Sequence, residues 1–231
     1  MLGRMAYGYA DLPALMARLT GDEKHSVAAT STMDVLWVLY DRVLDLRPGN
    51  AADPDRDRFL LSKGHGAMAF YATLVVKGFL DEGALDDWGA FGSPLGMHPD
   101  RVVLPGAEIS SGSLGHGLPL ALGIALGWRA QRRTAPRLVV LVGDAELDEG
   151  SNAEAIQLAG RLGLEQLTAV VVDNASSSHG WPGGIERRFE LEGWTGRAVD
   201  GRDHEALYGA FTDPHPGRPL AVVAQVEPNG G

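Results

Sequence analysis

The sequence predicts an α/β domain in three layers, in which a parallel sheet is covered by helices on both faces. Two apolar runs, 138–142 and 167–172, have the length and β-branched content of buried strands, and residues 156–162 between them have a helical pattern. Asp144 and Asn174 follow these two runs, 30 residues apart (174 − 144 = 30), which suits one strand-helix-strand unit. Ligands of such sheets normally lie beyond the carboxyl ends of the strands.

The amino-terminal half begins with a short helix over 12–19 and a stronger one over 33–44, where apolar residues recur in steps of three and four. A connection rich in proline and charge, 47–57, precedes a short strand at 58–61. The strand leads directly into Ser62-Lys63-Gly64-His65, and a helix over 67–77 follows, ended by Gly78.

The remaining elements follow the same alternation. Residues 83–105 form a long, loop-rich stretch, and loops of this length in a compact domain usually bind something. Further elements are a small-residue helix over 113–130, helices over 187–191 and 205–211, a strand near 197–200 and a last strand over 219–226.

Composition limits the classes of function. The chain has 231 residues, of which 45% are hydrophobic, so one large domain with a sizeable core is expected over 1–231. A formal charge of −10 argues against nonspecific nucleic-acid binding. Without cysteine there are no disulfides or thiolate ligands. No signal-peptide pattern or membrane-spanning apolar run occurs, so a cytoplasmic protein without nucleic-acid or membrane partners is expected.

The chemistry of Asp144 and Asn174 points to a cation. A carboxylate and an amide oxygen at neighbouring strand ends can share the coordination shell of Mg²⁺ with phosphate oxygens and water. Taken alone, the same two residues are better explained as strand-ending caps of the next turn.

Four motifs, in order along the chain, resemble the amino-terminal half of transketolase: Ser62-Lys63-Gly64-His65-Gly66, Gly96-Met97-His98-Pro99, 110–117 with its serines and glycines, and 149–155. The segment from Gly143 to Asn174 is similar to the family's thiamine diphosphate motif. The likeness runs from about Glu23 to Val226, so the chain resembles the amino-terminal subunit of a split transketolase. This implies a single diphosphate-binding domain, with the pyrimidine-binding and carboxyl-terminal domains on a separate partner chain in a heterotetramer of two plus two.

The resemblance also implies a set of site residues. The cofactor would be thiamine diphosphate with Mg²⁺ or Ca²⁺, and the metal ligands would be Asp144, Asn174 and the backbone carbonyl of Ser176. Residues expected along the cofactor are His65, Gly112, Ser113, Leu114, Gly143, Asp144, Ala145, Glu146, Asn174, Ser176 and Ser178. The catalytic candidates are His65, His98 and His25, as proton carriers at the substrate channel, and Glu149, near the subunit interface.

Each assignment has an alternative. The histidines could be structural, and Glu149 could be a solvated carboxylate at a helix start. Ala145 replaces the family's second glycine, where a positive φ would not be available, and Ser178 replaces an apolar residue. His25 lacks the family's Gly-His-Pro-Gly context.

The expected function is transfer of a two-carbon ketol or related acyl unit to a carbonyl acceptor. The glutamate that activates the aminopyrimidine belongs to the family's pyrimidine-binding domain, so catalysis would need the partner. The alternatives are a decarboxylating subunit like that of the ketoacid dehydrogenases and a noncatalytic assembly subunit.

Overall fold

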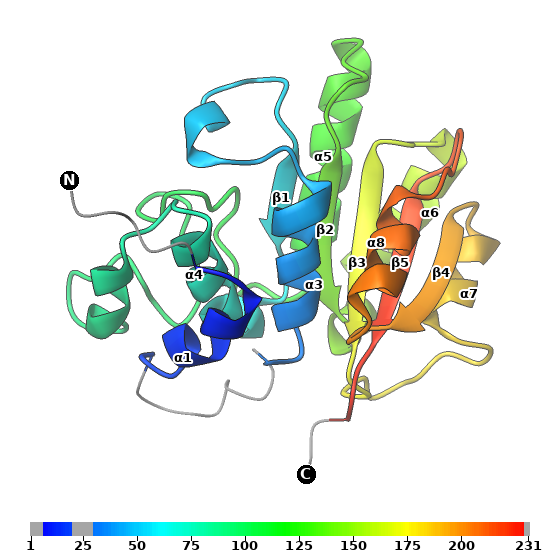
Figure 1. Cartoon of the computed structure of the whole chain (residues 1–231). Helices are drawn as coiled ribbons and strands as arrows, with labels where there is room; N and C mark the ends of the chain where they lie inside the picture. Colours follow the sequence, from blue (N-terminus) through cyan, green and yellow to red (C-terminus); the bar gives the residue numbers. More distant parts are fainter. Residues whose placement is uncertain (1–6, 20–29, 229–231) are drawn as a thin grey trace.

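A computed structural model of the chain describes residues 7–19 and 30–228. Its centre is a five-stranded, wholly parallel sheet in the order β1-β2-β3-β5-β4 (Figure 1). The strands are β1 Arg58–Leu61, β2 Leu138–Gly143, β3 Leu167–Asp173, β4 Thr195–Asp200 and β5 Leu220–Gln225. The predicted parallel α/β class is therefore confirmed.

Helices cover both faces of the sheet, because successive strand residues point to opposite sides. Phe59, Leu141 and Val170 pack in one core with α1 Leu12–Met16, α3 Met33–Val38, α4 Ala67–Val76 and α8 His204–Thr212. Leu60, Val140 and Val171 pack in a second core with α5 Gly117–Ala130, α6 Gly150–Leu162 and α7 Ile185–Leu191. Figure 1 shows α3 and α8 in front of the strands. The result is the predicted three-layer arrangement.

Two helix boundaries differ from the sequence prediction. The helix expected from residue 113 begins at Gly117, because Gly112 and Gly115 have φ values of 108° and 83°, which no right-handed helix allows. The crossover helix begins at Gly150 rather than near Ile156, so the metal-motif strand reaches it through one short 3₁₀ turn, Ala145–Asp148. Both corrections place more of the motif residues in loops at the carboxyl edge of the sheet.

Other differences are small. The first helix ends at Met16, a π-type turn Leu39–Val43 continues α3, and a 3₁₀ turn Glu82–Asp87 lies within the predicted loop-rich stretch. Within the described residues, no helix is both long and apolar enough to cross a membrane.

Backbone hydrogen bonds to neighbouring strands fix the first residues of the motifs directly after the strand ends. The amides of Ser62 and Lys63 both donate to the carbonyl of Leu141, at 2.9 and 3.0 Å, and the Asp144 amide donates to the carbonyl of Val172 at 3.2 Å. β2 and β3 pair through Gly143 opposite Val172. Residues that lie far apart in sequence therefore leave the same edge of the sheet as neighbours.

Candidate functional site

A pocket of about 270 Å³ lies at the carboxyl edge of the sheet. Three of the four transketolase-like motifs, together with the segments 143–146 and 174–176, contribute residues to it. It is lined by Ser62, Lys63, Gly64, His65, His98, Gly112, Leu114, Gly143, Ala145, Glu146, Asn174 and Ser176. Most of the residues predicted from sequence therefore meet in one place, although no single stretch of chain contains them.

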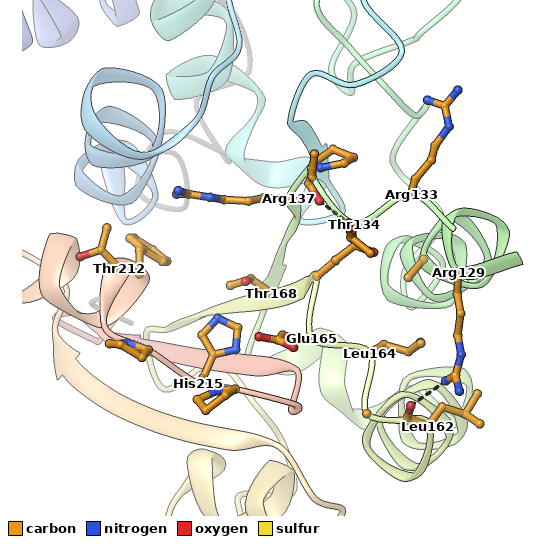
Figure 2. Close-up of a pocket in the computed structure, with 18 of the residues that line it drawn as sticks. Arg129, Arg133, Thr134, Arg137, Leu162, Leu164, Glu165, Thr168, Thr212 and His215 are labelled. Atoms are coloured by element: carbon orange, nitrogen blue, oxygen red, sulfur yellow. Dashed lines mark hydrogen bonds between the residues drawn. The ribbon is translucent and has the colours of Figure 1, made fainter. Parts of the chain in front are cut away.

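A larger cavity of about 830 Å³ lies at the opposite edge, beyond the amino ends of β2 and β3 (Figure 2). None of the expected site residues lines it. Three of its arginines donate to backbone carbonyls: Arg129 to Leu162 at 2.7 Å, Arg133 to Pro54 at 3.0 Å and Arg137 to Val43 at 3.1 Å. Figure 2 shows these three side chains spread apart rather than converging. The chemistry-bearing residues thus favour the smaller pocket as the functional site.

Asp144 has only 2% of its surface exposed and is not itself among the lining residues, although Gly143 and Ala145 on either side of it are. Its Oδ2 accepts the amide N–H groups of Ser176 and Ser177, at 2.5 and 2.9 Å, and its Oδ1 accepts the Ser176 hydroxyl at 2.6 Å. Ala175 makes the turn that brings these donors to the carboxylate, with a φ of 55° that L-residues rarely adopt. Asp144 and the loop after β3 are thereby joined.

Asn174 lies at the end of β3, 1% exposed, and lines the pocket. Its side-chain oxygen Oδ1 has no hydrogen-bond partner within the described part of the chain. A buried acceptor left unsatisfied costs roughly 1–3 kcal/mol, so this oxygen is explained best as a ligand for a group that binds there. The described residues contain no cluster of three or more His, Asp or Glu side chains suited to a metal. A cation here would need amide, carbonyl and phosphate oxygens in addition to Asp144, as expected for a hard divalent ion.

Lys63 is a functional candidate that the sequence analysis did not single out. It lines the pocket with 8% of its surface exposed, and its ammonium makes no hydrogen bond or ion pair with other described residues. Burial lowers the pKa of this ammonium, while the charges of Asp144, Glu146 and Asp173 oppose the shift. A buried amine with unused donors is suited to an anion. The available signal was a basic residue placed directly after a strand, inside a glycine motif.

Glu146 holds three of the motifs together. Its buried carboxylate, 1% exposed, accepts the Ser62 hydroxyl and the amides of Gly115 and Gly143, the last two at 3.1 and 3.3 Å. The Ser62 oxygen in turn accepts the amide of Gly117 at 3.0 Å. Burial raises the pKa of the Glu146 carboxyl, and these hydrogen bonds oppose the shift. The residue predicted to lie along the cofactor does border the pocket, but its oxygens are used to position the loops.

Two histidines stand on the pocket wall, and the ring of His98 lies between two glycines. The rings of His65 and His98 have centroids 5.9 Å apart. A Cβ atom on Gly64 would lie 2.3 Å from His98 Cδ2, and one on Gly112 would lie 3.1 Å from His98 Cγ. Only glycine therefore allows these backbones to approach the imidazole, which explains their place in the motifs.

Ser113, Glu149 and Ser178, also predicted to belong to the site, do not line the pocket. Ser113 and Glu149 are exposed, and Ser178 is exposed with its amide donating to Asp148 at 3.1 Å. Ala145 starts a 3₁₀ turn and is not among the residues with positive φ, so its methyl group causes none of the backbone conflict expected from the lost glycine. His25 lies outside the described residues.

Comparison with known proteins identifies the domain. The family model for the transketolase thiamine diphosphate binding domain matches residues 19–219. The chain belongs to the transketolase family. The resemblance inferred from its motifs is thus confirmed, and at family level the relatives are transferases.

Relatives of this transketolase domain include single subunits and full-length enzymes. "Ferredoxin fas2" of Rhodococcoides fascians is 57% identical over 95% of this chain and 72% of its own length. An apulose-4-phosphate transketolase subunit from Actinobacillus succinogenes is 32% identical over 90% of this chain and 77% of its own. The solved transketolase of Leishmania mexicana superposes with a TM-score of 0.76 at 26% identity, covering 95% of this chain and 36% of that enzyme. This chain thus spans about a third of the solved transketolase.

The name of the Rhodococcoides relative does not extend to this chain's chemistry. Iron–sulfur clusters of ferredoxins are held by cysteine thiolates. This chain contains no cysteine, so it supplies no such ligand.

Proposed function

We propose that this chain is the diphosphate-binding subunit of a two-component, transketolase-like transferase. In this proposal Asp144, Asn174 and the backbone carbonyl of Ser176 hold a divalent cation, Mg²⁺ or Ca²⁺, which binds the diphosphate of thiamine diphosphate. The observation that carries the proposal is the unsatisfied Oδ1 of Asn174, buried in a pocket beside the loop that Asp144 anchors. An oxygen-rich cation site is the simplest partner for that atom.

The remaining pocket residues fit an anion that enters with the cation. Lys63 offers a buried ammonium whose charge adds to that of the metal. Bound thiamine diphosphate supplies a nucleophilic carbon that accepts a two-carbon ketol unit. His65 and His98, on the same wall, would donate protons to carbonyl and hydroxyl oxygens of the sugar and remove them again.

The size of the pocket supports a partner chain. Pockets that enclose a drug-sized ligand usually measure about 300–1,000 Å³, and this one of about 270 Å³ fits only part of such a molecule. Leu114, which lines the pocket, is 55% exposed, and a partner surface that covers the pocket would bury it together with the cofactor. We propose that a pyrimidine-binding chain covers this pocket and that two copies of each chain form a heterotetramer. Several relatives are named as subunits, which supports the division.

The substrate class is proposed only broadly. The relatives named for apulose 4-phosphate and for 6-deoxy-6-sulfo-D-fructose indicate that subunits of this kind serve different ketoses. We propose a ketose donor and an aldehyde acceptor, with the partner contributing the groups that choose between sugars.

Calorimetric titration of thiamine diphosphate into the chain, with and without Mg²⁺, tests the cofactor proposal. Binding should require the cation, and Asp144→Ala and Asn174→Ala should each abolish the cation-dependent part. Asp200→Ala is the matched control, because Asp200 ends β4 on the same edge of the sheet but does not line the pocket. The titrations are repeated with the pyrimidine-binding chain present. A complex of the two chains that binds no cofactor would instead support a noncatalytic assembly role.

A further inference from the structure

The loop after Asn174 carries three consecutive serines, and two acids hold all three. Asp144 accepts hydrogen bonds from Ser176 and Ser177, as described above. Asp148, four residues later, accepts the Ser177 hydroxyl at 3.1 Å and the Ser178 amide at 3.1 Å. The loop is therefore fixed to the 3₁₀ turn Ala145–Asp148 by side-chain carboxylates at two points.

Ser176 differs from its neighbours because two separate donors, its amide and its hydroxyl, bond the two oxygens of one carboxylate. Its amide donates to Oδ2 and its hydroxyl donates to Oδ1, so the two bonds fix the plane of the Asp144 carboxylate. Oδ2 has a second donor, the Ser177 amide, whereas the hydroxyl is the single donor to Oδ1 among the described residues. A carboxylate oxygen has two lone pairs, so Oδ1 keeps one for a cation.

The turn that brings Ser176 to the Asp144 carboxylate begins directly after Asn174. Ala175, in the left-handed conformation, separates the unsatisfied amide oxygen of Asn174 from the donors of Ser176. The hydrogen bonds from Ser176 and Ser177 thus fix the Asp144 carboxylate and the backbone that follows Asn174 before any ligand arrives.

We propose that the Ser176 hydroxyl is a positioning group for the cation: it orients Oδ1 of Asp144 toward the ion and thereby sets the affinity of the site. This inference rests on the proposed function, because it assumes that Asp144 is a ligand. Groups that orient metal ligands from outside the coordination sphere typically contribute about 10- to 100-fold in metal affinity. The role belongs to the side chain of Ser176, separately from its backbone carbonyl.

Three variants distinguish the effect of the Ser176 hydroxyl from the effects of the rest of the loop. Ser176→Ala removes the bond to Oδ1 and keeps the amide bond to Oδ2, and Ser176→Thr keeps a hydroxyl at the same position. Ser177→Ala is the matched control, because it removes a hydroxyl that bonds Asp148 and leaves the Asp144 bonds in place. Mn²⁺ is titrated into each variant at saturating thiamine diphosphate, with and without the partner chain, and followed by electron paramagnetic resonance. Melting temperatures are measured without cation.

Ser176→Ala should weaken Mn²⁺ binding by about tenfold. Ser176→Thr and Ser177→Ala should both stay within about twofold of the parent chain. The inference is overturned if Ser176→Ala binds Mn²⁺ like the parent, or if its only effect is a lower melting temperature of the cation-free protein. Asp144→Ala distinguishes a failure of the proposed cation site from a failure of the role given to the Ser176 hydroxyl. If it too binds Mn²⁺ normally, the proposed cation site is wrong; if it abolishes binding while Ser176→Ala does not, only the role of the hydroxyl is wrong.

Discussion

Ser62 and Glu146 form a buried hydrogen bond although 84 residues separate them in the chain. Through this bond the glycine-histidine loop after β1 is joined to the turn after β2. The amides of Gly115 and Gly117, which donate to Glu146 and to Ser62, add the loop before α5 to the same network. One acid therefore assembles three walls of the pocket, and its ionisation is tied to their stability.

Glu146→Gln tests this link through pH. The pKa of Glu146 is raised in the folded chain, so its favourable contribution is complete below the unfolded-state pKa and is lost as pH rises through the folded-state pKa. Glutamine does not titrate. Urea unfolding between about pH 5 and 8 should therefore show the parent chain gaining stability relative to Glu146→Gln as pH falls. If the difference in unfolding free energy between the parent chain and Glu146→Gln stayed constant across this pH range, the pKa of Glu146 would not be raised in the folded chain.

Gly117→Ala and Gly123→Ala form a matched pair on helix α5. A Cβ on Gly117 would lie 2.2 Å from the Ser62 Cβ and Oγ, whereas a Cβ on Gly123 meets nothing within 4 Å. The first change should cost about 1–3 kcal/mol of unfolding free energy, since Ser62 is itself buried. The second should stabilise the chain by up to about 1 kcal/mol, through higher helix propensity. Denaturant midpoints compare the two, and equal effects would refute the close approach.

Lys63→Met should weaken binding of thiamine diphosphate by about 10- to 100-fold, because a charge-assisted hydrogen bond to the diphosphate is lost. The cofactor-free chain should be as stable as the parent or more so, since the change removes a largely buried ammonium that has no hydrogen bond or ion pair to the other described residues. Arg132→Met is the control: it removes one positive charge from the cavity at the opposite edge of the sheet. Calorimetry measures both. An equal loss of affinity in the two variants would mean that the net charge of the chain, rather than contact between Lys63 and the diphosphate, determines the affinity.

Ala175→Gly should stabilise the folded chain by up to about 1 kcal/mol, because glycine adopts a positive φ without strain. Ala206→Gly, inside helix α8, should have the opposite effect and cost about 0.5–1 kcal/mol. Thermal unfolding distinguishes the two signs. Destabilisation of the chain by Ala175→Gly would mean that the methyl group contributes packing that outweighs the backbone strain.

Much of this fold could be predicted from the apolar runs and from glycine. Runs such as 138–142 and 167–172 are long and uniformly apolar because both faces of the sheet are covered, so their strands were clear. The positions of Asp144 and Asn174 followed from the strand ends. The order of the strands did not, since it depends on contacts between distant segments. The start of α5 did not either, since it depends on the positive φ values of Gly112 and Gly115.

The site was predicted less completely, and the reasons are physical. Sequence patterns show which residue types are present, but not which donors are already used. Lys63 became a candidate only from its burial and from the lack of a hydrogen bond or ion pair between its ammonium and the rest of the described chain. The carboxylate of Glu146 accepts hydroxyl and amide donors from other loops. The role of Ser176 likewise depends on the positive φ of Ala175. An alanine in the sequence does not indicate a positive φ, as a glycine would.

The pairing of Gly143 with Val172 limits which length changes this protein tolerates. Adding or deleting one residue inside β2 or β3 would turn Asp144 or Asn174 to the opposite side of the sheet and exchange the two cores. The same change in the turn 131–137 leaves that pairing intact. Natural insertions and deletions among functional homologues should therefore collect in such turns and spare both strands.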